Sequence, residues 1–287
     1  MTISIDIADS IEPSQSEHAR PSRRTSRRIN WAPIVFPLLL AVLVITLWQV
    51  VCTVREIPEY LFPAPSDVLD AATENAGLIL SAFVITGTEA VVAFVVSAAV
   101  GILGAFLLSS HRIIELSAYP YAILLQTIPS IATAPLIIIW FGVTQTSVVI
   151  IATIMAFVPV LSNTLIGLRS ADRRMVELFA LLDASKWQTL VRLRIPASMP
   201  YIVGGLRVSS TMSVIGVIVA EYISGIGSGR AGLGFLITKS ASRFETPLLF
   251  AAGLACAALG IVFFQIVQWF GRLLLSSWHE SEMSSAS

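Results

Sequence analysis

The chain has 287 residues, of which 55% are hydrophobic and only 13% are charged, and its mean hydropathy is +0.82. Soluble domains carry about 25% charged residues, so this composition excludes an ordinary soluble enzyme or binding module and predicts an integral membrane protein. The two cysteines, Cys52 and Cys256, lie inside apolar runs far apart in the chain, which excludes a disulfide framework or a zinc site.

Residues 1–30 are polar and end in RPSRRTSRR. They lack the apolar bulk to fold, so we expect a disordered basic tail on the cytoplasmic side. Residues 31–278 are expected to form one transmembrane domain, and residues 279–287 a short C-terminal tail.

Six stretches are long and apolar enough for a helix that crosses a bilayer, which needs about 20 residues. They are residues 34–53, 82–108, 119–141, 147–168, 202–223 and 248–275. The predicted fold class is therefore an all-α integral membrane protein with six transmembrane helices.

Lysine and arginine set the expected orientation, because they gather on the cytoplasmic side of a membrane. With the N-terminus inside, thirteen of these residues fall on the inner side and four on the outer side (Arg55, Arg230, Lys239 and Arg243). Both termini and the segment 169–200 are then predicted to be cytoplasmic.

The segment 169–200 is charged and amphipathic, and it lies between two apolar runs. MVELFALL (175–182) has a helical period, Asp183 is suited to a corner or to an N-cap, and a second helix can begin at Ala184. In that second helix Ala184, Trp187 and Leu190 form an apolar stripe, and Lys186 points away from it. Pro196 is predicted to end it. This hairpin either packs on its own bundle or binds a partner.

Polar residues inside the predicted spans are candidates for a translocation pathway. Most of them lie on one proline-rich face of the predicted span 119–141. Prolines leave backbone groups without hydrogen bonds, and such groups are tolerated in a membrane only beside protein or water. The candidates are Gln126, Thr127, Ser130, Thr133, Asn163, Ser213 and Glu221. For the first four, simple helix packing is an equal alternative, and the small residues around Ser213 are also typical of helix contact.

Glu221 comes at the end of a predicted span, where the helix dipole disfavours a carboxylate. It is therefore paired, with Arg230 or Lys239, or it functions at an outer gate, and of these we favour pairing.

The segment 177–196 resembles the EAA loop of bacterial ABC importer permeases, which has the form E-A-A, three residues, Gly, nine residues, I-x-L-P. Glu177 stands at the Glu, Asp183 at the Gly, and Leu193-Arg194-Ile195-Pro196 at the last four positions, while Leu178 and Phe179 replace the two alanines. EIPEYLFPAPSDV (56–68), QTIPSIATAPLIIIWFG (126–142), and AEYISG (220–225) with GLGFLI (232–237) resemble the nitrate, sulfonate and taurine branch of the same family.

This resemblance implies the fold of a type I ABC importer permease in the bacterial inner membrane, working as a homodimer. Its partners would be two ATPase subunits and an extracytoplasmic binding protein, and the chain itself would be no enzyme and bind no cofactor or metal. ATP and Mg²⁺ would belong to the ATPase, because the chain has no G-x-x-x-x-G-K-[ST] motif. The ATPase would contact the residues of the loop: Glu177, Asp183, Ala184, Ser185, Lys186, Trp187, Leu190 and Pro196.

The implied solute is small and polar or anionic, like a sulfonate, nitrate or taurine. A pyrimidine or vitamin precursor carried by the same machinery is the alternative. An ion-coupled secondary transporter is a weaker rival, because the ionisable residues of the spans (Glu89, Arg207 and Glu221) fall near span ends instead of the middle of the membrane.

Overall fold

The computed structural model describes residues 32–110, 117, 120, 121, 124, 130–225 and 231–284. All regular secondary structure in this part of the chain is helical. Two compact units divide the chain, Met1–Val44 and Ile45–Ser287. The first unit contains the beginning of the helix at Ala32–Val54, and the second contains the rest of that helix and every later element.

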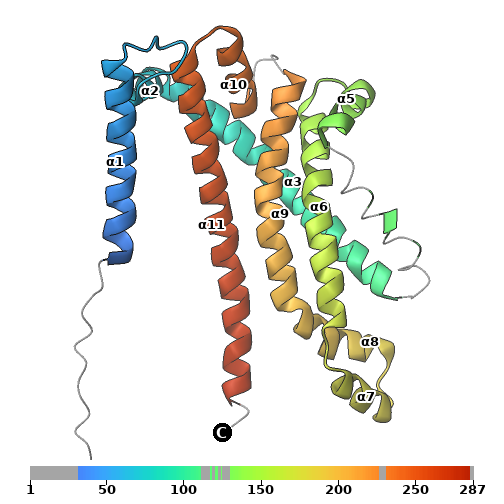
Figure 1. The fold of residues 1–287 in the computed structure, drawn as a ribbon. Helices are drawn as coiled ribbons and strands as arrows, with labels where there is room; N and C mark the ends of the chain where they lie inside the picture. Colours follow the sequence, from blue (N-terminus) through green and yellow to red (C-terminus); the bar gives the residue numbers. More distant parts are fainter. Residues whose placement is uncertain are drawn as a thin grey trace, which may run out of the picture. The chain divides into compact units, whose positions relative to one another are not determined.

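The elements are shown in Figure 1. In chain order they are α1 (Ala32–Val54), α2 (Pro65–Glu74), α3 (Ala76–Ser110), α5 (Ser130–Phe141), α6 (Gln145–Arg169), α7 (Arg173–Leu181), α8 (Lys186–Thr189), the π-helical turn η1 (Leu190–Arg194), α9 (Ile195–Ser224), α10 (Leu233–Ser242) and α11 (Thr246–Ser284).

Five helical stretches among the described residues are long and apolar enough to cross a membrane: α1, α3, α6, the run from α8 through α9, and α11. Each coincides with a predicted span, which confirms the predicted all-α transmembrane class. The remaining predicted span, 119–141, overlaps the shorter apolar helix in α5, and most of its first half lies outside the described residues.

Helix α6 packs against both α9 and α3, and Figure 1 shows α6 and α9 side by side. The contact between them is close, since a Cβ added to Gly216 of α9 would lie 2.7 Å from Ala152 Cα. Likewise, a Cβ on Gly101 of α3 would lie 2.8 Å from Val160 Cβ of α6. Small residues let helix backbones approach in a membrane, where no hydrophobic force drives helices together. Gly101 and Gly216 therefore let α3 and α9 pack closely against α6.

Two apolar clusters form the interior. The larger joins α3, α5, α6, α9, α10 and α11, and it includes Ile151, Val217 and Leu233. The smaller lies toward the segment 169–200 and joins the last turns of α3 to the end of α6, with Leu190 and Ile195 packed against it. Many large apolar side chains of α1, α3 and α11 remain exposed, as expected where lipid replaces water.

The link between α1 and α3 is held by local polar contacts. Asp67 Oδ2 accepts from the Ala64 N–H (2.8 Å), and Pro65 begins α2 at a position where its missing N–H costs nothing. Gln49 of α1 contacts Ser66 twice, through Nε2 to Oγ (3.2 Å) and through Oε1 from the backbone N–H (3.1 Å). The Thr246 hydroxyl donates to the Tyr60 carbonyl at 2.6 Å, which joins this link to the start of α11.

Candidate functional site

The segment 169–200 forms the predicted hairpin of two short helices. Asp172 begins α7 by accepting a hydrogen bond from the Arg174 N–H at 2.9 Å. Along α7, Arg173 Nε donates to Glu177 Oε1 at 3.1 Å, and both side chains are exposed. No described residue of α7 is buried, so this helix projects from the subunit instead of forming part of its core.

Asp183 is the corner of the hairpin, with a φ of +51°. The Ala184 N–H donates to the Phe179 carbonyl (3.0 Å) and the Asp183 N–H to the Ala180 carbonyl (3.2 Å). These are the two hydrogen bonds of a Schellman motif, whose left-handed residue is most often glycine and sometimes Asn or Asp. This geometry explains why an aspartate can stand where the EAA pattern has glycine.

The predicted cap of the second helix was wrong. Asp183 does not cap it and it does not begin at Ala184; Ser185 is the N-cap and the helix begins at Lys186. The Gln188 N–H donates to Ser185 Oγ (3.2 Å), and the Ser185 N–H donates to Gln188 Oε1 (2.7 Å). This reciprocal capping box was readable in the sequence as Ser-x-x-Gln.

We expect Asp183→Gly to be tolerated and Asp183→Val to impair uptake. Glycine adopts a positive φ without strain, whereas the left-handed region costs other residues roughly 1–2 kcal/mol and is worst for β-branched ones. Uptake and co-purification of the ATPase, measured at equal permease levels, check both variants. Equal behaviour of the valine and glycine variants would show that the corner conformation is unimportant.

Pro196 does not end the second helix, contrary to the prediction. Helix α8 continues through η1 into α9, and the Ile195 N–H donates to the Leu190 carbonyl across the π-helical turn. Pro196 lies in the first turn of α9 and donates no backbone hydrogen bond, and the π-helical turn directly before it lets the helix continue past it. The hairpin is therefore joined to a transmembrane helix by continuous helical backbone, with no loop between them.

The hairpin exposes large apolar side chains outside the predicted bilayer. Trp187 is 71% exposed, and Leu181 and Leu182 are exposed as well. Leu190 differs from these, because it packs against the permease's own smaller cluster. Large apolar side chains exposed together outside a membrane mark an interaction surface.

A groove of about 1020 Å³ separates the hairpin from the last turns of α3. Leu103 and Phe106 of α3 form one wall, and Ala184, Lys186 and Trp187 are on the other. Lys186 was predicted to point away from the apolar stripe, yet it lines the same groove as Trp187. What distinguishes the two residues is therefore their chemistry, since they do not occupy opposite faces.

Glu221 forms the other polar centre of the subunit, at the far end of α9. Its side chain is only 3% exposed, and it accepts from Thr86 Oγ1 of α3 (2.8 and 3.0 Å) and from the Gly234 N–H of α10 (2.7 Å). Thr86 Oγ1 in turn accepts from the Leu233 N–H at 2.8 Å. Glu221 thus connects α9, α3 and the first turn of α10.

The described contacts of Glu221 are with Thr86, with Gly234 and with the buried acid Glu89, so the favoured pairing with Lys239 is replaced by hydrogen bonds, and Arg230 lies outside the described residues. Gly234 has no room for a side chain, because an added Cβ would lie 2.8 Å from Glu221 Cβ. Sequence reasoning missed Thr86. It stands three residues before Glu89 in an apolar run, and this polar pair on one helix face was the available signal.

The remaining pathway candidates are spread along the bundle. Asn163 donates to the Pro159 carbonyl (2.8 Å) beside Gly205 of α9, and the buried Ser213 donates to the Ser210 carbonyl (2.9 Å). Gly205, Ser213 and Glu221 follow one another at eight-residue steps along α9, about 12 Å each. The structure therefore does not bring Asn163, Ser213 and Glu221 to one site.

The other four candidates belong to the predicted third span. Gln126 and Thr127 lie outside the described residues. Ser130 is the first residue of α5, and Thr133 is half-buried in the same helix. Their role in a pathway stays a prediction.

Three comparisons with known proteins agree with this architecture. Residues 97–277 match the family model described as "Binding-protein-dependent transport system inner membrane component". The chain is 30% identical over 257 residues to the riboflavin transport system permease RibX of Chloroflexus aurantiacus, which covers 89% of this chain and 94% of that protein. It is 28% identical over 280 residues to an aliphatic sulfonates transport permease, SsuC of Bacillus subtilis, covering 96% of this chain and 98% of that protein.

The crystal structure of an amino acid ABC transporter with histidines has the same fold, with a TM-score of 0.56 and 19% sequence identity. The similarity covers 70% of this chain and 95% of that one. The family match spans well over half of the chain, from the middle of α3 into α11. The chain therefore belongs to the inner membrane components of binding-protein-dependent transport systems, the membrane-spanning permeases of ABC transporters.

Proposed function

We propose that this permease imports a small polar or anionic solute, and that ATP hydrolysis on a separate ATPase subunit drives it through the hairpin of α7 and α8. The observation that carries the proposal is the hairpin's exposed apolar surface, with Trp187 71% exposed on a helix continuous with α9. Rigid backbone from the hairpin into a transmembrane helix suits a part that passes movement from one to the other.

The assembly we propose is a homodimer with two ATPase subunits, which hold ATP and Mg²⁺, and one binding protein on the other side of the membrane. The N-terminus, the C-terminus and the hairpin face the cytoplasm of a bacterial cell. The positive-inside rule supports this orientation, as thirteen lysines and arginines then lie inside against four outside.

For the solute, a sulfonate-like anion is our first proposal, supported by the similarity to a sulfonates permease over nearly the whole chain. A pyrimidine or vitamin-type solute is the second, favoured by the similarity to a riboflavin permease. Ion-coupled transport has less support, since Glu221 is engaged in hydrogen bonds to two other helices and is poorly placed to bind a travelling ion.

Reconstituted vesicles test the proposal. The permease and its ATPase are inserted together, ATP is enclosed on the ATPase side, and the substrate-loaded binding protein is added on the other side. We expect uptake of either an alkylsulfonate or a riboflavin-type solute that requires ATP and the binding protein. Uptake driven by an ion gradient without ATP would overturn the proposal.

We expect Trp187→Ala to weaken binding of the ATPase by about tenfold or more, and Lys186→Ala to weaken it much less. Truncating an aromatic at an interface centre commonly costs about 2 kcal/mol, whereas an exposed charge contributes about 0–1 kcal/mol. The measurement is a titration of purified permease with its ATPase, beside a thermal melt of the permease alone. A lower melting temperature with unchanged binding would instead place Trp187 in the permease's own packing.

A further inference from the structure

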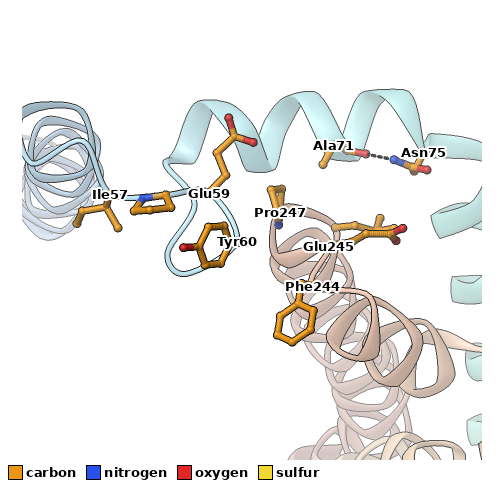
Figure 2. A pocket seen from close by; sticks show the side chains of 10 residues that line it. Ile57, Glu59, Tyr60, Ala71, Asn75, Phe244, Glu245 and Pro247 are labelled. Carbon is orange, nitrogen blue, oxygen red and sulfur yellow. Dashed lines mark hydrogen bonds between the residues drawn. The ribbon is translucent and has the colours of Figure 1, made fainter.

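A second open cavity lies at the end of the subunit away from the hairpin. It has a volume of about 770 Å³ and is bounded by residues 57–60, by α2, and by the corner between α10 and α11. Figure 2 shows Glu59 and Tyr60 on one side of it and Glu245 and Phe244 on the other. We call this the outer cavity. Helix α9 spans 30 residues between the two ends, a length of about 45 Å.

The walls of the outer cavity are fixed to one another. The Thr246 hydroxyl holds the Tyr60 carbonyl at 2.6 Å, and Gln49 of α1 holds Ser66 at the start of α2 through two hydrogen bonds. Helix α2 also packs against α11. A surface that is formed before binding loses little conformational entropy when a partner arrives.

Aromatic side chains stand exposed around the outer cavity. Phe244 is 74% exposed and has a φ of +58°, a conformation that few bulky residues adopt. Tyr60 and its neighbour Leu61 are also exposed. Phe244 lies between Arg243 and Glu245, at the end of the spans, so it does not face the bilayer core. Exposed aromatics beside a concave surface are typical of the anchoring residues of protein interfaces.

The charges beside Tyr60 are mainly negative, whereas Phe244 has one basic and one acidic neighbour, Arg243 and Glu245. Residues 55–75 contain five acids and one base, Arg55. Two acids, Glu59 and Glu245, line the outer cavity itself. A partner that fits this surface carries lysines or arginines around an apolar tip, because opposite charges steer association and like charges prevent it.

We propose that the outer cavity is a docking surface for the extracytoplasmic binding protein, which places basic side chains beside Glu59 and Glu245 and an apolar contact on Tyr60 and Phe244. The inference rests on the proposed function, which puts the hairpin in the cytoplasm and this end outside. The inference adds to the proposed function the surface on which the binding protein docks and the positive charge expected on the binding protein at that contact.

The test uses the permease with its ATPase in lipid nanodiscs, titrated with the substrate-loaded binding protein, with stimulated ATP hydrolysis as the readout. Glu59→Lys with Glu245→Lys should raise the half-saturating concentration of binding protein by about tenfold or more. Phe244→Asn should also raise the half-saturating concentration. This variant should keep the wild-type fold, because asparagine tolerates a positive φ. Basal hydrolysis and melting temperature should stay as in the wild type.

Asp70→Lys is the matched control, since Asp70 is an exposed acid of α2 outside the cavity lining. It should change the half-saturating concentration less than the double variant does. Wild-type stimulation curves for the double variant and for Phe244→Asn would overturn the docking surface while leaving the proposed function in place. Absence of stimulation in the wild-type complex would overturn both.

Discussion

Replacing Glu177 with lysine should reduce uptake at least about tenfold and reduce co-purification of the ATPase, with the permease still inserted and stable. The variant permease should remain as stable as the wild type because Glu177 lies outside the spans, on a helix with no buried residue. Glu177 and Arg173 are one helical turn apart and form an exposed ion pair. Such pairs contribute about 0–1 kcal/mol to stability. A charge reversal at a docking surface, by contrast, puts like charges together and costs several times more.

Arg173→Ala is the matched control for this variant. It removes the 3.1 Å ion pair but keeps the carboxylate, so it separates the pair from Glu177 itself. We expect uptake near the wild-type level for Arg173→Ala and strong loss for Glu177→Lys, both at equal amounts of protein in the membrane. Equal loss in both variants would assign the effect to the local ion pair, and normal uptake by Glu177→Lys would remove Glu177 from the coupling surface.

The transmembrane architecture was largely predictable, because lipid imposes a length and a composition on every span. The residues at which the spans begin and end were less predictable. The span was predicted to begin at residue 202 because Pro196 was interpreted as a helix boundary, whereas helix α9 begins at Ile195. A proline in the first helical turn gives no such boundary, and the π-helical turn before it accommodates the change in helical pitch.

The hairpin was predicted from its amphipathic period, and its corner from a residue that tolerates a positive φ. The capping box of Ser185 and Gln188 was within reach of the same reasoning and was missed, because Asp183 alone was considered as the cap. Local hydrogen-bond chemistry of this kind can be read from four residues of sequence.

The partners of Glu221 were not predictable in the same way. The search for a countercharge led to Arg230 and Lys239, which are close in sequence, while the residue that binds it is Thr86, 135 positions away. The Gly234 N–H of α10 also donates to Glu221, the Leu233 N–H donates to Thr86, and no sequence pattern identifies these groups as donors. Long-range contacts between neutral donors and a buried acid require the packing of the helices to be known.

Glu221→Ala should lower the melting temperature of the purified permease by several degrees or more. The change leaves two buried donors, the Thr86 hydroxyl and the Gly234 N–H, without their acceptor. Each buried group that loses its partner costs roughly 1–3 kcal/mol, and about 1 kcal/mol corresponds to roughly 2–4 °C in a domain of this size. Glu221→Gln, which keeps one acceptor oxygen, should lose less.

Thr86→Val identifies the contact responsible. It should destabilise the permease by a similar amount, and Thr86→Val with Glu221→Ala should fall short of the sum, because both changes remove the same hydrogen bond. Asp70→Ala, at an exposed acid of α2, should leave the melt unchanged. Additive losses, or a wild-type melt for Glu221→Ala, would show that this carboxylate does not hold α10 to α3, and the first turn of α10 would then owe its position to the apolar packing of Leu233 alone.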